Sequence, residues 1–140
     1  MVRRSFLVAV CGAVLLAAPG CGGPMQAQEL ARSVQTLESS AAEGALLAED
    51  VARDRTKATF ARAHSRDLSE TVDHEAEKLA DADANGEVAM RKSQAVDLAD
   101  RISQALGKLQ DSPGVESEGA SAERQLRSSA KRAAEISDAL

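Results

Sequence analysis

Side chains that could support catalysis or metal binding are few and scattered along this chain. His64 and His74 are its two histidines, and a spacing of ten positions turns them about 80° apart on an ideal helix. Ferritin-like bundles bind metal through a Glu and a His three residues apart, whereas Glu70 and His74 are four apart. The carboxylates from Asp67 to Glu77 have no aromatic pocket to desolvate them. The sequence therefore predicts neither a metal site, nor a cofactor, nor an enzyme.

Cys21 is the residue for which the sequence predicts a specific modification, because it lies at the end of a short apolar leader. Arg3 and Arg4 give the leader a positive start, and the stretch from Phe6 to Ala18 is uncharged. This stretch has 13 residues, fewer than the roughly 20 that a helix needs to span a bilayer. Cleavage before Cys21 would make it the first residue of the mature chain and its one cysteine.

The end of the leader, Leu16-Ala17-Ala18-Pro19-Gly20-Cys21, resembles the lipobox of bacterial lipoprotein precursors. This resemblance implies a signal peptide over residues 1–20, and a diacylated Cys21 that carries acyl chains such as palmitate. Residues 21–25 would then form the lipidated tether. Two acyl chains anchor a protein stably without a spanning helix. We therefore expect the protein at the cell membrane, lipid-anchored on the extracytoplasmic face.

Two alternatives concern the same leader. Ordinary secretory cleavage near Ala18 or Gly20 would leave the Cys21 thiol free or bridging two copies. The run Arg3-Arg4-Ser5-Phe6-Leu7 also resembles the twin-arginine export signal, which would mean passage across the membrane in a folded state. The leader alone does not decide between the general secretory route and the twin-arginine route.

The composition indicates a small, acidic, helical protein. About 120 residues follow the leader, enough for one small domain. Loss of Arg3 and Arg4 leaves 15 basic residues against 22 acidic ones, a net charge of minus 7, which argues against nucleic acid as a partner. Alanine occurs 28 times, and Phe60 would be the one aromatic residue of the mature chain. These features favour helices and disfavour an aromatic-lined pocket.

The spacing of apolar residues predicts a single all-α domain over residues 26–140. The first helix runs from about Pro24 to Asp54. We expect a turn around residues 54–59, the alternative being one unbroken helix of nearly 60 residues. Asp54, Thr56 and Thr59 are the candidate N-caps of the second helix.

Two further connections follow from turn-forming residues. Asn85-Gly86 is expected to end the second helix, since both residues tolerate the left-handed conformation. Ser112-Pro113-Gly114 ends the third helix, and residues 115–119 have the composition of a turn. Short connections make successive helices antiparallel, so we predict an up-down-up-down helical bundle of four helices, with a long helical hairpin as the alternative.

Positions three and four residues apart are predicted to form the core of this bundle. They are Leu30, Val34, Leu37, Ala41, Gly44, Ala48 and Val51 in the first helix, Leu68, Val72, Ala76 and Leu79 in the second, Val88, Ala95, Ala99, Ile102, Leu106 and Leu109 in the third, and Ala122, Leu126, Ser129, Ala133, Ile136 and Leu140 in the last. Gly44 would allow a close helix crossing. Four acid-to-base pairs at i,i+4 are predicted on exposed faces, namely Glu49 with Arg53, Glu87 with Arg91, Asp97 with Arg101, and Glu123 with Arg127.

Charge is unevenly distributed along the chain. A cluster that we call the basic turn consists of Arg53, Arg55, Lys57, Arg62 and Arg66. The acidic turn is its opposite and consists of Asp73, Glu75, Glu77, Asp81, Asp83 and Glu87. In a bundle tethered at Cys21, the acidic turn would lie near the membrane and the basic turn would point away from it. Either cluster could also be no more than a solvated helix end.

The function expected from the sequence is a structural or protein-interaction role at the bacterial cell envelope. The membrane partner would be reached through a lipid on Cys21, and the basic turn is the candidate binding site for an envelope protein or an anionic wall polymer. The alternative is a lipoprotein that binds a small ligand or an ion in the bundle interior, although alanine-rich seams leave little room there.

Overall fold

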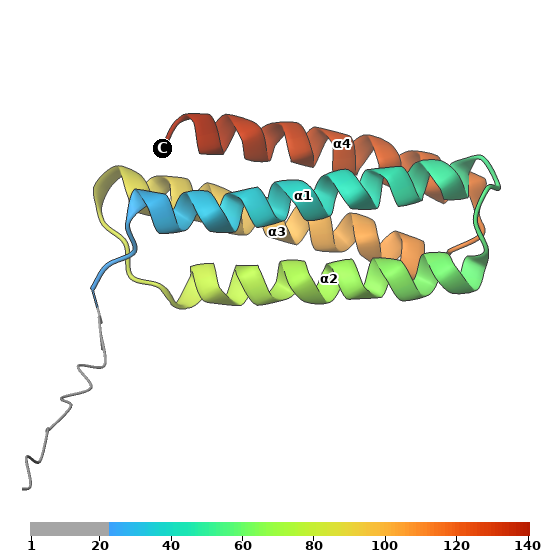
Figure 1. The fold of residues 1–140 in the computed structure, drawn as a ribbon, viewed down its shortest axis with the longest axis horizontal. Coiled ribbons are helices and arrows are strands. Elements are labelled where there is room, and N and C mark those ends of the chain that lie inside the picture. Colours follow the sequence, from blue (N-terminus) through green and yellow to red (C-terminus); the bar gives the residue numbers. More distant parts are fainter. Residues whose placement is uncertain (1–22) are drawn as a thin grey trace, which may run out of the picture.

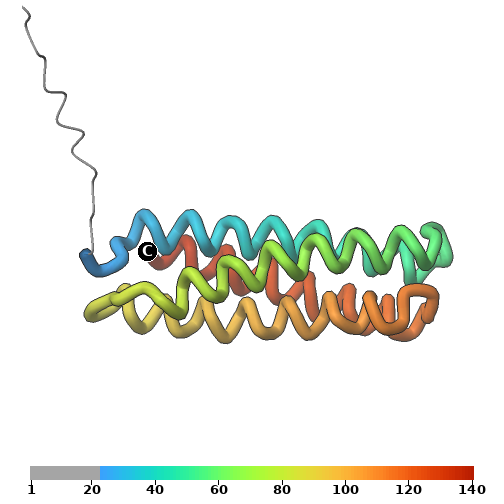
Figure 2. The backbone as a smooth tube through the Cα atoms, turned by 90° about the horizontal axis from the view of Figure 1, so that it is seen from below, coloured from blue at the N-terminus to red at the C-terminus, as the bar shows by residue number. Residues whose placement is uncertain are grey.

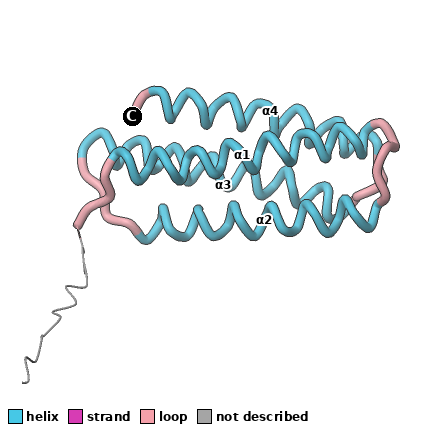
Figure 3. The backbone as a smooth tube through the Cα atoms, in the orientation of Figure 1, coloured by secondary structure: helices cyan, strands magenta, loops and turns pink. Residues whose placement is uncertain are grey.

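The computed structural model describes residues 23–140, which form an antiparallel bundle of four helices and contain no strand (Figure 3). The helices are α1 (Ala27–Ala52), α2 (Ala58–Asp81), α3 (Gly86–Asp111) and α4 (Glu116–Asp138). They run up, down, up and down along one rod, with the start of the described chain and the C-terminus at the same end (Figure 1). The predicted bundle is confirmed, and the helical-hairpin alternative is not the structure.

Helix packing within the rod is uneven. α1 packs most extensively against α4, and α2 packs most extensively against α3. α1 also touches α3 across the core, whereas α2 and α4 are not in contact. The perpendicular view in Figure 2 shows all four helices following the same long axis. At 1.5 Å per residue, the 26 residues of α1 make the rod about 39 Å long.

The core follows the predicted seams closely. Every predicted position of α1 and five of the six in α4 are buried. Ala76, Val88 and Leu140 are partly buried against the same core. Ala61 and Ser65 are buried as well, although Arg62 and Ser65 interrupt the apolar spacing of the sequence there. The buried face of α2 therefore begins immediately after the connection between α1 and α2.

The connection between α1 and α2 is a turn, as predicted for residues 54–59, and it has the geometry of a Schellman motif. The backbone N–H of Arg55 donates to the carbonyl of Asp50 at 2.8 Å, and the N–H of Asp54 donates to that of Val51 at 3.1 Å. Asp54 adopts a left-handed φ of 52°. The N-cap of α2 is Lys57, which makes no side-chain cap hydrogen bond.

The N-cap prediction was therefore wrong for Asp54, Thr56 and Thr59. Asp54 lies too early because its left-handed backbone closes α1 instead of opening α2. Thr59 lies too late because it is already inside α2, which begins at Ala58.

Two other boundaries differ from the expectation. Asn85 is the N-cap of α3, and Gly86 opens that helix with a φ of 58°, so this pair begins a helix instead of ending one. α2 already ends at Asp81 and is followed by extended backbone at Ala82. Residues 116–119, which have turn composition, form the first turn of α4.

Close approach between helices explains two glycines. A Cβ at Gly119 would lie 2.7 Å from the backbone nitrogen of Ala52 and 3.0 Å from the carbonyl oxygen of Ala48. A Cβ at Gly44 would lie 2.8 Å from Leu106 Cδ2 and 3.2 Å from Leu126 Cδ1. At Gly44 the close neighbours are the ends of leucine side chains from α3 and α4, whereas at Gly119 they include the backbone of α1. Gly119 allows the start of α4 to lie directly on the end of α1.

Candidate partner-binding site

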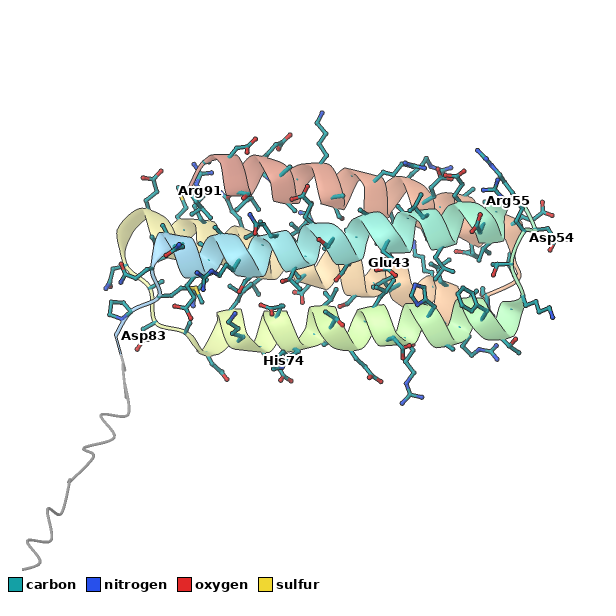
Figure 4. All side chains as sticks on the ribbon, viewed as in Figure 1. Glu43, Asp54, Arg55, His74, Asp83 and Arg91 are labelled. Atoms are coloured by element: carbon teal, nitrogen blue, oxygen red, sulfur yellow. The ribbon has the colours of Figure 1, made fainter. Side chains whose placement is uncertain are left out.

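The basic turn and the entry of the chain lie at opposite ends of the rod. Asp54 and Arg55 lie at one end in Figure 4, and Asp83 of the acidic turn lies at the other. The described chain enters at the end that holds Asp83, where the N–H of Met25 donates to the Asp83 carbonyl at 2.6 Å. Met25 is buried, so α1 begins almost as soon as the chain reaches the bundle. Cys21, the predicted lipidation site, lies outside the described residues.

The loop between α2 and α3 holds this entry point. Lys92 Nζ donates to the Ala82 carbonyl at 2.6 Å, which fixes one side of the loop. Gln26 Nε2 donates to the Pro24 carbonyl at 2.8 Å, just before α1 begins. The end of the bundle nearest the chain entry is therefore built from ordered, hydrogen-bonded backbone.

Two arginines of the basic turn form ion pairs with the same carboxylate of α1. Glu49 accepts ion pairs from Arg53 at 2.8 Å and from Arg55 at 3.2 Å. Arg127 of α4 also reaches Glu49, at 2.7 Å, and Arg55 pairs with Asp50 at 2.7 Å. The Glu49 side chain is 17% exposed. This network holds the ends of α1 and α4 together and uses part of the positive charge of the basic turn.

The other members of the basic turn lie along the start of α2. Arg62 Nε donates to the carbonyl of Gln110 at 3.1 Å, in the last turn of α3, where a cation also interacts favourably with the helix dipole. Arg66 pairs with Glu70 at 3.0 Å and is 72% exposed. The Lys57 side chain takes part in no hydrogen bond or ion pair with residues 23–140, and only its carbonyl is engaged, accepting from the N–H of Ala61 at 2.9 Å.

The structure therefore divides the predicted cluster into two groups. Arg62 and Arg66 line a broad surface hollow between α2 and α3, about 790 Å³ in volume, together with three carboxylates. The full lining is Thr59, Arg62, Ala63, Arg66, Asp67, Glu70, Gln110 and Asp111. Arg53 and Arg55 belong instead to the network around Glu49. Lys57 and Arg66 are the members of the basic turn that lie outside both the Glu49 network and the Arg62 contact with Gln110, and Arg66 stays 72% exposed although it pairs with Glu70.

The two histidines are separated, as their spacing predicts. His64 Nε2 lies 2.8 Å from Glu43 Oε1 on α1, and its ring stacks on Phe60 with the centroids 5.4 Å apart. His74 is exposed on α2 (Figure 4). Among the described residues, no three His, Cys, Asp or Glu side chains are grouped as metal ligands would be. The arrangement of His64 fastens α2 to α1.

A second cationic region escaped the sequence analysis. Arg101 on α3 and Arg124 and Arg132 on α4 line one groove between these helices. The recurrence of Arg124, Ser128 and Arg132 every four residues could have indicated a polar stripe on α4. Its alignment with Arg101 depends on the register of α3 and α4, which the sequence pattern does not supply.

No helix within residues 23–140 is long and apolar enough to cross a membrane. No family model, curated protein or solved structure matches this chain.

Proposed function

We propose that this protein is a lipid-anchored, extracytoplasmic spacer of the bacterial cell envelope, which presents the basic turn to an acidic partner. A diacylated Cys21 would hold one end of the rod at the membrane. The partner would be an envelope protein or a wall polymer that carries carboxylates or phosphates. Recognition would depend on helix faces and charge, without a chemical reaction.

The observation that carries the proposal is the position of the basic turn relative to the chain entry. α1 begins next to the entry point and ends at the basic turn, so one helix of about 39 Å separates them. Three residues separate Cys21 from the buried Met25, which would keep the near end of the rod close to the bilayer. The basic turn would then be carried well above the membrane surface.

Charge gives the partner its expected chemistry. Lys57 and Arg66 are exposed at the far end of the rod, and long cationic side chains attract carboxylate or phosphate groups most strongly at low ionic strength. The chain as a whole is acidic, so an acidic partner would be attracted only where cationic side chains cluster, as they do at this end. We expect binding to weaken as salt is added.

The partner-binding proposal is tested by pull-down from a membrane extract with a soluble form that begins at Gly22. The variant Lys57→Gln/Arg66→Gln removes two charges from the basic turn without touching the Glu49 network. The control Arg32→Gln/Lys131→Gln removes two exposed charges elsewhere. We expect the first pair to reduce recovery of the partner about tenfold at low salt and the control to leave it unchanged. Equal recovery with both pairs would remove the basic turn from the proposal.

The anchor is tested separately by fractionating cells that express the chain with Cys21→Ser. Loss of the acylated sulfur should release the protein from the membrane fraction, because no described helix can span the bilayer. A Cys11→Ser variant is the matched control and should stay in the membrane fraction. Retention of the Cys21→Ser variant in the membrane would contradict the anchor.

A further inference from the structure

We propose that the groove between α3 and α4 is a binding site for a phosphate-bearing anion. The groove is a surface hollow of about 400 Å³. Its lining residues are Leu98, Arg101, Gln104, Arg124, Gln125, Ser128, Ser129 and Arg132. Three arginines, two amides and two hydroxyls therefore face one cavity whose lining includes no carboxylate, in a chain whose net charge is negative.

The charges of Arg101 and Arg124 are available to a ligand. Neither residue has a carboxylate within 4.0 Å among residues 23–140, and the i,i+4 pair predicted between Asp97 and Arg101 does not form. Both arginines are exposed, so they can approach an anion without breaking an existing contact. Asp97 lines a smaller adjoining hollow together with Arg101 and Arg132, and Glu135 pairs with Arg132, so these two carboxylates are opposing charges beside the groove.

Cross-helix hydrogen bonds mark the two ends of the groove and hold its walls in register. Lys108 Nζ donates to Gln125 Oε1 at 3.3 Å, toward the far end of the rod. Arg132 Nη2 donates to Gln94 Oε1 at 3.5 Å, toward the chain entry, while its Nη1 pairs with Glu135 at 2.9 Å. The stretch of α4 from Gln125 to Arg132 is about 10 Å long. The groove therefore suits an elongated anion better than a spherical one.

The donor chemistry favours phosphate. Guanidinium groups bind phosphate oxygens through paired, charge-assisted hydrogen bonds. Hydroxyl and amide donors can satisfy the remaining oxygens of a phosphate group, and Ser128, Gln104 and Gln125 supply them. Because Lys108 occupies the oxygen of the Gln125 amide, the amide nitrogen keeps its donors for a ligand. The buried Leu98 and Ser129 form the base of the cavity.

This phosphate could belong to a soluble oligophosphate or to a lipid head group, and two probes distinguish the sources. The full chain, purified in a non-ionic detergent, is titrated with tripolyphosphate at low ionic strength by calorimetry. The same chain is assayed for binding to phosphatidylcholine vesicles with and without phosphatidylglycerol. Arg101→Gln and Arg124→Gln are compared with Arg32→Gln, which removes one exposed charge on α1.

We expect saturable binding of one of the two probes, weakened about tenfold by Arg101→Gln and by Arg124→Gln and less than twofold by Arg32→Gln. All three substitutions are at exposed positions, so circular dichroism should report unchanged helix content. Equal weakening by the three variants would show non-specific charge attraction and overturn the site. Failure of both probes to bind would overturn it as well. Neither outcome involves the basic turn, so the proposed function is tested independently.

Discussion

The interface between α1 and α4 and the interface between α1 and α2 consist of different kinds of contact. Against α4, the helix presents Ala48 and Val51 to Gly119, so closely that a Cβ on this glycine would collide with backbone atoms. Against α2, it presents polar groups: Ser33 accepts a hydrogen bond from Lys78 Nζ at 3.0 Å, and Glu43 meets His64. The side of α1 that faces α4 is held by close packing, and the side that faces α2 is held in part by polar contacts.

A surface hollow of about 360 Å³ follows the interface between α1 and α2. Its lining is Arg32, Gln35, Thr36, Ser39, Ser40, Glu43, Leu68 and Thr71. Small residues let helices approach to full van der Waals contact, whereas polar side chains at a hollow leave room for water. We infer that α1 and α4 form the rigid half of the rod, and that α2 is secured chiefly by α3.

The largest expected difference between the two interfaces comes from truncating one leucine in each of them. Leu126 is fully buried and packs on Gly44, whereas Leu68 lines the hollow and is 7% exposed. We expect Leu126→Ala to lower the free energy of unfolding by about 3 to 5 kcal/mol and Leu68→Ala by about 2 kcal/mol, because a cavity is costliest where neighbours cannot collapse. Urea unfolding monitored by circular dichroism measures both. Equal losses would contradict a difference in packing.

Two glycine-to-alanine substitutions test the close contact between α1 and α4. Gly119→Ala places a methyl group against Ala52 backbone, so we expect a loss of about 1 to 3 kcal/mol despite the better helix propensity of alanine. Gly107→Ala is the matched control, because a Cβ there has no neighbour within 4 Å. It should stabilise the protein by up to about 1 kcal/mol. Thermal unfolding of the two variants should shift in opposite directions, and a shift of the same sign would mean that the contact is loose.

A substitution in the turn that connects α1 to α2 should have a smaller effect. Asp54 has a left-handed φ of 52°, which costs an L-residue other than glycine about 1 kcal/mol or more. Asp54→Gly should therefore raise the free energy of unfolding by up to about 1 kcal/mol, and Asp54→Val should lower it. Chemical unfolding measures both changes. Destabilisation by glycine would show that the Asp54 side chain, and not the backbone, sets the turn.

The smallest expected effect concerns the polar interface. Ser33→Ala removes the acceptor of the Lys78 hydrogen bond, but Lys78 stays 40% exposed and also lies 3.5 Å from Glu75. We expect a loss below about 1 kcal/mol, because water can replace the hydroxyl. Amide hydrogen exchange sharpens the result: α2 should exchange faster than α1 and α4 in the wild type, and Ser33→Ala should widen that gap. Uniform protection of all four helices would refute a looser α2.

The periodicity of apolar residues was sufficient to predict which positions of the helices are buried. Leu30, Leu37, Ile102 and Ile136 were all predicted to face the core, because helical spacing alone separates buried from exposed positions. The turn near Asp54 was located for the same reason, since the apolar repeat that ends at Val51 meets Arg55 and Arg62 before it resumes at Leu68. These features depend on neighbours three or four residues away.

What the sequence did not supply depends on contacts between distant segments. Gly119 resembles a turn residue until α1 is packed against it, so the start of α4 was missed. Glu49 divides the basic turn because Arg127 arrives from another helix. Likewise, Arg101 joins Arg124 only through the register of α3 and α4. Each of these required the tertiary structure.

The rigid half of the rod also connects the structure with the proposed function. α1 begins at the chain entry and ends at the basic turn, and it packs more extensively against α4 than against any other helix. A lipid on Cys21 would therefore fix the height of the basic turn above the membrane. This geometry has a functional meaning only if the anchor exists.

The most direct test is the mass of the N-terminal peptide from protein isolated from native membranes. We predict a peptide that begins at Cys21 and whose mass is increased by a thioether-linked diacylglyceryl group. A peptide that begins at Met1, or an unmodified Cys21, would contradict the account.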